Sequence, residues 1–276
     1  MTFSNCEKFF EWVSLQDYSN SHKTHILCYF RKHLQNRAFI DTFEFQKYIT
    51  TKKIGLASIV LAGRAFLNYC AEFELYPIEV IEKYRKILKI KDNNPDVYCP
   101  SNDEVLKNYQ LIKNHKSLDI LYLVLTVSGI RLIEALKFLQ TYQIERFIHH
   151  KNFVVYSVGE TRNTKTINSI FLPTFVYNKL HHVSNSYQSL RMRLRKKGVK
   201  LGLKYLRKWQ FNFCLYQGIP ESICDYLQGR ANHTIGSLHY MARQQQSEFW
   251  YAKIADKFKK IFACNNSNIS KTVGVR

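Results

Sequence analysis

The sequence predicts a mainly α-helical protein that carries one small antiparallel sheet. Apolar side chains recur at helical spacing along most of the 276 residues. The chain has 5 prolines and 10 glycines and no repeat of fixed period, which is typical of a helical globular protein. Three short runs of β-branched and aromatic residues lie close together after residue 146, and these runs predict the sheet.

Residues 1–90 predict a compact bundle of helices. Asp41 and Glu44 have the spacing of an acidic cap followed three residues later by a glutamate, so a helix is expected to start there. A long apolar helix is expected from about Ile54 to Phe73, and Tyr76-Pro77 is expected to stop it.

Residues 91–97 are expected to form a linker, because this stretch is polar, contains a proline and has no apolar periodicity. A second domain is expected over residues 98–276. Ser101 and Glu104 have the spacing of a capping box at the start of its first helix. A buried helix is expected over Leu118–Ser128, with a left-handed cap at Gly129.

The three strand-like runs are Phe147–His149, Phe153–Val158 and Ile167–Leu172, and they predict a small antiparallel meander. Helical patterning returns after Pro173 and continues to about Phe262, so this domain is expected to be α+β. The last helical stretch has an apolar face that either packs on its own domain or docks on a neighbouring protomer. The candidate residues of that face are Phe249, Trp250, Ile254 and Phe258.

Basic residues outnumber acidic ones by 41 to 21, which gives a formal net charge of +20. On a folded surface such an excess indicates a polyanion partner. No apolar stretch is long and uninterrupted enough to cross a bilayer, and the first residues lack the pattern of a signal peptide. The 7 cysteines are scattered, without a CxxC pair, and therefore predict reduced thiols in a cytoplasmic protein.

The sequence contains no GxxxxGK[ST] loop, no GxGxxG turn after a strand, no HExxH helix and no acidic cluster suited to magnesium. A metal-dependent nuclease needs such carboxylates. We therefore expect no metal, no cofactor and no small-molecule substrate.

Six side chains in the second domain are candidates for chemistry on a phosphate: Arg131, Lys165, Lys204, Arg207, Arg230 and Tyr240. Arg131 follows a helix-ending glycine and precedes Glu134 by one helical turn. Lys165 lies in the turn between the last two strand-like runs, where Arg162 is the alternative candidate. Lys204 and Arg207 are three residues apart and share a helix face. Arg230 follows Gly229 directly, and Tyr240 lies ten residues further on.

In this order and in these contexts, the residues resemble the motifs of the tyrosine recombinase (phage integrase) family. The resemblance covers roughly residues 98–262. The runs Gln228-Gly229-Arg230 and His239-Tyr240 are most similar to integrases of archaeal spindle-shaped viruses and related plasmids. At two positions the chain differs from the usual motif, because Lys204 replaces a histidine and Arg230 replaces a histidine or tryptophan.

The resemblance implies a helical core-binding domain over residues 1–90 and a recombinase catalytic domain with a C-terminal tail over residues 98–276. It implies a site-specific recombinase that acts on a double-stranded DNA attachment site in the host cytoplasm. It also implies that four copies of the chain assemble on DNA, and that the reaction integrates or excises a mobile element without metal or ATP.

The chemistry of strand cleavage explains why these residue types are needed. Attack by the phenol oxygen of Tyr240 builds negative charge on the phosphate, and fixed donors aimed at that charge are usually the largest catalytic contribution. Arginine grips two oxygens and stays charged, so Arg131, Arg207 and Arg230 are the expected clamp. Lys165 is the expected general acid for the leaving 5′ oxygen, and Lys204 is expected to assist.

A second set of basic residues predicts contacts to the DNA backbone. It consists of Lys32, Arg37, Lys52, Lys53, Arg64, Arg191, Arg193, Arg195, Lys196 and Lys197. The bland alternative for the run from residue 191 to 197 is a solvated helix face. Two other functions stay open, namely a recombinase-derived protein that binds DNA without cleaving it, and a nicking-closing enzyme similar to type IB topoisomerases.

Overall fold

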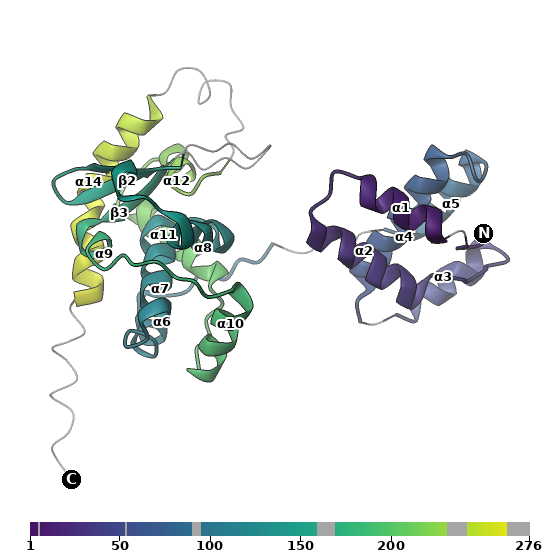
Figure 1. Cartoon of the computed structure of the whole chain (residues 1–276), viewed down its shortest axis with the longest axis horizontal. Coiled ribbons are helices and arrows are strands. Elements are labelled where there is room, and N and C mark those ends of the chain that lie inside the picture. Colours follow the sequence, from purple (N-terminus) through teal and green to yellow (C-terminus); the bar gives the residue numbers. More distant parts are fainter. Residues whose placement is uncertain (5, 53, 90–94, 159–168, 231–241, 264–276) are drawn as a thin grey trace, which may run out of the picture. The chain divides into compact units, whose positions relative to one another are not determined.

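The computed structural model describes residues 1–4, 6–52, 54–89, 95–158, 169–230 and 242–263. The chain divides into two compact units, Met1–Asp96 and Val97–Arg276 (Figure 1). The predicted fold class is confirmed, because the described residues form helices and one three-stranded antiparallel sheet. No helix in the described part of the chain has the length and apolar character needed to cross a membrane.

The first unit is a helical bundle around a phenylalanine-rich core. Its elements are α1 (Cys6–Leu15), α2 (Asn20–His33), α3 (Thr42–Thr50), α4 (Leu56–Glu72) and α5 (Ile78–Ile87). Helix α4 packs against α1, α2 and α5. In the core, the rings of Phe9 and Phe30 lie 4.6 Å apart and those of Phe3 and Phe66 lie 5.0 Å apart. Aromatic burial of this kind is a main source of stability.

The predicted helix starts in this unit follow local rules. Asp41 caps α3 by accepting a hydrogen bond from the backbone nitrogen of Glu44 at 2.8 Å. The long apolar helix, α4, ends at Glu72, and Glu74 then adopts a left-handed conformation with φ 51°. The sequence predicted that Tyr76-Pro77 would stop α4, but the helix ends before them, at Glu72. Pro77 stands instead at the start of α5, where a fixed φ is favourable.

The second unit surrounds the small sheet with helices. Its elements are α6 (Asn102–Gln110), α7 (Lys116–Ser128), α8 (Leu132–Thr141), η1 (Ile144–Arg146), β1 (Phe147–His149), β2 (Phe153–Ser157), β3 (Ser169–Pro173), α9 (Thr174–Tyr177), α10 (Tyr187–Lys196), α11 (Lys204–Tyr216), α12 (Glu221–Leu227) and α14 (Arg243–Ala263). The predicted capping box of Ser101 and Glu104 and the left-handed cap at Gly129 (φ 66°) are both present.

The sheet has the order β1-β2-β3, and Val155 pairs with Ile148 on one side and Phe171 on the other. Both faces of β2 and β3 are buried, whereas β1 exposes Ile148 and His149. The ring of Phe171 lies 5.3 Å from that of Tyr251 on α14, whereas Tyr156 contacts Phe138 of α8. Figure 1 shows α14 beside β2 and β3.

Helix α14 packs on its own unit. Tyr251, Ile254 and Phe258 are 0 % exposed there. The hydroxyl of Tyr251 donates to the backbone carbonyls of Val127 and Phe171, both at 3.1 Å. Of the two alternatives for this apolar face, the structure supports packing within the same chain for Ile254 and Phe258, whereas Phe249 is exposed.

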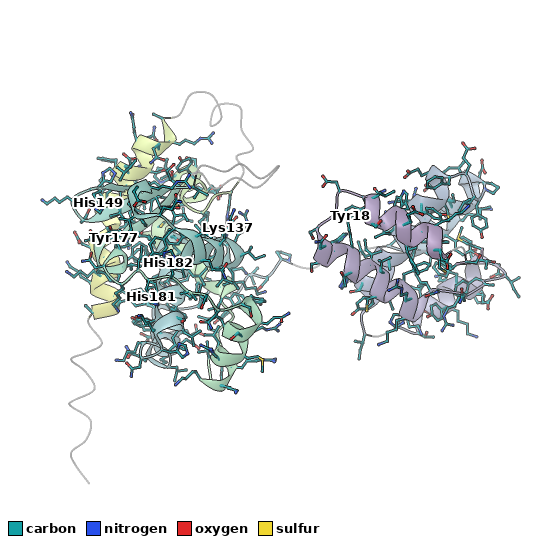
Figure 2. The ribbon with its side chains drawn as sticks, viewed as in Figure 1. Tyr18, Lys137, His149, Tyr177, His181 and His182 are labelled. Carbon is teal, nitrogen blue, oxygen red and sulfur yellow. The ribbon has the colours of Figure 1, made fainter. Side chains whose placement is uncertain are left out.

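The region after Pro173 is less continuously helical than predicted. Residues 180–186 form no helix. In this stretch the backbone nitrogen of Val183 donates to the carbonyl of Leu139 on α8, and the ring of His182 stacks on Tyr142 at 4.3 Å. Figure 2 labels His182, His149 and Tyr177. The rings of His149 and Tyr177 meet edge to face, with their centroids 5.1 Å apart. These tertiary contacts take the place of local helical bonds, which a sequence pattern cannot reveal.

Candidate phosphate-binding site

Arg131 stands at the corner between α7 and α8. Gly129 ends α7 in the left-handed region, and Arg131 is the extended N-cap of α8 with φ −70° and ψ 149°. Glu134 accepts hydrogen bonds from both the backbone nitrogen of Arg131, at 2.8 Å, and its Nη1, at 2.9 Å. The same Nη1 also donates to the carbonyl of Gly229 at 3.1 Å. The side chain is therefore oriented before any ligand arrives.

Arg207 lies on the first turn of α11 and is partly buried. Its Nη1 donates to the backbone carbonyls of Gly129 and Gln228, both at 2.7 Å. Burial lowers the pKa of Arg207 to about 10, with further lowering by the charges of Arg131 and Arg230. The mutual influence of these charges means that the three predicted clamp arginines share one site.

Arg230 follows Gly229, which adopts a left-handed conformation (φ 64°) just after α12. Its guanidinium pairs with Asp225 at 3.2 Å and lies 4.4 Å from the ring centroid of Phe211. A cation over an aromatic face is attracted by the ring quadrupole. Arg230 is thus held from two sides, and 39 % of its side chain is exposed.

Lys204 begins α11, one turn before Arg207. Its Nζ lies 4.6 Å from the ring centroid of Tyr205. Lys204, Arg207 and Arg131 line one cavity of about 610 Å³, together with Arg191 and Arg195 of α10. The cavity has an apolar wall that includes Leu190, Leu194 and Leu201. A cavity lined by both cationic and apolar side chains suits a phosphate that carries an organic group.

Lys165 and Tyr240, the expected general acid and nucleophile, lie outside the described residues, as does the alternative acid Arg162. Described residues close to these positions in the sequence are joined by the side chain of Gln244, near the start of α14. Gln244 Oε1 accepts hydrogen bonds from the hydroxyls of Ser169, at 3.1 Å, and Tyr226, at 2.8 Å. One side chain therefore joins the start of β3, α12 and the start of α14.

In the first unit, three of the predicted DNA-contacting residues gather around His33. Burial lowers the pKa of His33, and the charges of Lys32, Lys52 and Arg37 lower it further. Arg37 and Lys52 also lie over the ring of Tyr48, at 4.7 and 4.2 Å from its centroid. We call Lys32, His33, Arg37, Tyr48 and Lys52 the basic cluster of the first unit. Such a cluster favours a polyanion.

The remaining predicted DNA contacts differ in their surroundings. Arg64 donates to the carbonyl of Leu88 at 3.2 Å, so it ties α4 to the end of α5 rather than joining the basic cluster. Lys53 lies outside the described residues. On α10, Arg193 Nη1 lies 3.5 Å from His115 Nε2, whereas the other four members of the run are exposed. These four are Arg191, Arg195, Lys196 and Lys197.

Three residues around the site were not identified from the sequence: Gln210, Gln228 and Gln244. Gln210 and Gln228 are 0 % exposed. A signal was available for Gln210, because it lies four residues after Leu206 and three before Phe213 and so occupies an apolar face of α11. A buried amide at such a position requires hydrogen-bond partners.

The solved structures that match this chain share little sequence with it. An integrase from mycobacterium phage Brujita has 12 % identity and a TM-score of 0.41, with 89 % of this chain and 90 % of that chain covered. XerA recombinase has 12 % identity and a TM-score of 0.36, covering 87 % and 96 %. XerH site-specific recombinase, bound to its difH substrate in a pre-cleavage complex, has 11 % identity and a TM-score of 0.40, covering 90 % and 97 %.

The class of protein is identified by the sequence. Residues 97–257, more than half of the chain, match the model of a family of integrases described as archaeal phage integrase. The chain therefore belongs to the archaeal phage integrase family, and the resemblance inferred from its motifs is confirmed. No curated protein sequence matches it with significance.

Proposed function

We propose that this protein is a site-specific DNA recombinase that cleaves and rejoins strands through a 3′-phosphotyrosine intermediate. The observation that carries this proposal is the convergence of Arg131, Arg207 and Arg230 at one place, although they lie on three separate segments of the chain. Family membership supports the same reaction class. The arginines bind the non-bridging oxygens of the scissile phosphate and stabilise the charge that develops there.

The cleavage step can be written for the residues of this chain. The phenol of Tyr240 loses its proton to water and its oxygen attacks phosphorus, while the bond from phosphorus to the 5′ oxygen breaks. Lys165 gives a proton to the departing 5′ oxygen, and Lys204 assists at the phosphate. The phosphotyrosine bond keeps the energy of the broken diester. Attack by a new 5′-hydroxyl then restores the DNA strand and frees Tyr240, without ATP or metal.

Binding to duplex DNA uses charge outside the reacting centre. The basic cluster of the first unit and the exposed cations of α10 bind backbone phosphates, which provides affinity without sequence readout. We propose that the substrate is a specific attachment site, that four copies of the chain exchange strands on it, and that the outcome is integration or excision of a mobile element in the cytoplasm of a host cell.

The test is capture of the covalent intermediate on a nicked suicide duplex. Wild-type protein should form a protein–DNA adduct, and mass spectrometry should map it to Tyr240. Tyr240→Phe should abolish the adduct. The matched control is Tyr216→Phe, because Tyr216 is an exposed tyrosine at the end of α11 and its loss should leave the adduct unchanged. Tight binding of DNA without any adduct would overturn cleavage and leave a DNA-binding protein.

A second measurement separates strand exchange from simple nicking and closing. Wild-type protein should form Holliday junctions between two copies of its attachment site and should leave unrelated supercoiled plasmids unrelaxed. Relaxation of any supercoiled plasmid, with no junction formed, would contradict recombination and favour the topoisomerase-like function.

A further inference from the structure

Two buried glutamines lie directly behind the three arginines. Gln210 on α11 and Gln228 at the end of α12 are both 0 % exposed. Other buried polar side chains in the described residues, such as Thr126 and Ser128, donate to carbonyls within their own helix. The two glutamines instead bond across elements. Burying an amide is unfavourable unless its hydrogen bonds are made, so this pair calls for a role.

Arg207 and Gln228 are linked by two reciprocal hydrogen bonds. The Nη1 atom of Arg207 donates to the backbone carbonyl of Gln228 at 2.7 Å. In return, Gln228 Nε2 donates to the backbone carbonyl of Arg207 at 2.8 Å. Two bonds in opposite directions fix both the backbone and the guanidinium of Arg207 relative to the end of α12.

Gln210 links this pair to the corner at Gly129, which precedes Arg131. Gln228 Nε2 donates to Gln210 Oε1 at 2.6 Å, and Gln210 Nε2 in turn contacts Cys214 Sγ at 3.2 Å. A Cβ atom placed on Gly129 would come within 2.3 Å of Gln210 Oε1 and 2.8 Å of Gln228 Nε2. The two amides therefore pack directly on the backbone of the corner that precedes Arg131.

From these contacts we infer that Gln210 and Gln228 are positioning residues, which hold Arg207 and the corners at Gly129 and Gly229 in the geometry that grips the scissile phosphate. The inference rests on the proposed function, because it assigns the pair a role in cleavage. The glutamines do not touch the substrate. They act through Arg207 directly and through the backbone next to Arg131 and Arg230.

The test compares variants that keep side-chain volume and lose the amide. In Gln228→Met and Gln210→Met, single-turnover adduct formation at saturating protein should be slower by about 10- to 100-fold, since misplacing a charged donor by about 1 Å has effects of that size. The dissociation constant for the duplex should change by less than about threefold, because backbone contacts elsewhere dominate affinity.

A modified substrate distinguishes positioning from general damage. A methylphosphonate at the scissile position removes the charge that the arginines neutralise. On this substrate the defect of Gln228→Met should shrink to less than about threefold relative to wild type, because the clamp has less charge to stabilise. The control is Ile223→Val, a buried change on the same helix that lowers stability without touching Arg207. It should cleave both substrates at the wild-type rate.

Three outcomes would overturn the inference: wild-type rates in both glutamine variants, an equal loss on both substrates, or a loss explained by weaker DNA binding. A readout without cleavage covers the case in which wild-type protein forms no adduct. The side-chain N–H resonances of Arg207 in the free protein should exchange faster with water in Gln228→Met than in Ile223→Val. If wild-type protein forms no adduct although this exchange difference is present, the proposed function is wrong. If wild-type protein cleaves DNA normally but the exchange difference is missing, the positioning role is wrong.

Discussion

The guanidinium of Arg131 donates to the backbone carbonyl of Gly229, 98 residues further along the chain, at 3.1 Å. This bond joins the start of α8 to the end of α12, next to Arg230. Each arginine of the site is thus held by the segment that carries another, and a disturbance at one corner should be felt at the others. The predictions below follow from contacts of this kind.

Gly129→Ala should destabilise the protein much more than an ordinary glycine substitution. A non-glycine residue in the left-handed region costs about 1–2 kcal/mol. At Gly129 the added Cβ also collides with Gln210 Oε1 at 2.3 Å, and crowding of this kind adds about 1–3 kcal/mol. The control is Gly198→Ala, since Gly198 has φ 75° but no heavy atom within 4 Å of the added Cβ. If urea unfolding shows that Gly129→Ala and Gly198→Ala lose the same unfolding free energy, the side chain of Gln210 must move away from the added Cβ at no cost.

Phe211→Leu should slow strand cleavage slightly. The ring of Phe211 lies 4.4 Å below the guanidinium carbon of Arg230, and a partly exposed cation–π contact provides about 0.5–1 kcal/mol. If that energy holds Arg230 in place, single-turnover cleavage should fall about two- to fivefold. Phe249→Leu removes a similar contact with Lys253, at 3.9 Å, on α14, and should have no effect. A rate unchanged in both variants would mean that Asp225 alone positions Arg230.

DNA binding should strengthen as the pH falls, through His33. Its pKa is lowered by burial and by Lys32, Lys52 and Arg37, so in the free protein it is neutral at pH 7. A phosphate bound to the basic cluster offsets those charges and raises the pKa, so binding takes up a proton. The gain in affinity therefore begins as the pH falls through the pKa of the complex and is complete below that of the free protein, which lies under the ordinary value of 6.5.

This dependence can be measured by fluorescence anisotropy with a short duplex at fixed ionic strength. His33→Gln should flatten the pH profile and leave affinity at high pH nearly unchanged. His181→Gln, in the second unit, is the control and should keep the slope. A profile that is the same in His33→Gln as in wild type would place the phosphate away from the basic cluster.

Loss of a single hydroxyl should loosen α14. The Tyr251 hydroxyl is completely buried and donates to two carbonyls, those of Val127 and Phe171. Tyr251→Phe leaves both carbonyls without this donor, so it should lower the unfolding free energy by about 1–3 kcal/mol. Tyr216→Phe, at an exposed hydroxyl, should lower it by less than about 0.5 kcal/mol. In native-state hydrogen exchange, the backbone amides of α14 should exchange faster in Tyr251→Phe than in Tyr216→Phe.

Local signals made much of the fold predictable. The cap at Asp41, the capping box of Ser101 and Glu104, and the helix end at Gly129 all depend on residues within one turn of each other, so the sequence displays them directly. The three short runs of β-branched and aromatic residues predicted the meander for the same reason. Residues 180–186 could not be predicted in this way, because the backbone nitrogen of Val183 bonds to Leu139 of α8, which is distant in the sequence.

The site could be predicted only in part. The residue types and order of Arg131, Arg207 and Arg230 identified the clamp, since charge and motif are visible in the sequence. Glu134 and Asp225 lie close in the sequence to the arginines that they hold, whereas other partners are backbone carbonyls from distant segments, those of Gly129, Gln228 and Gly229. Gln244 bonds to Ser169 across 75 residues, and nothing in the local pattern of either residue indicates the other.

The burial of α14 has a consequence for how the protein exists away from DNA. Because the chain covers its own sheet with Tyr251, Ile254 and Phe258, the folded second unit does not need a helix from another copy to complete its core. Folding of this unit should therefore not depend on protein concentration. The melting temperature should be the same at low and high protein concentration, and any self-association would add to an already finished fold.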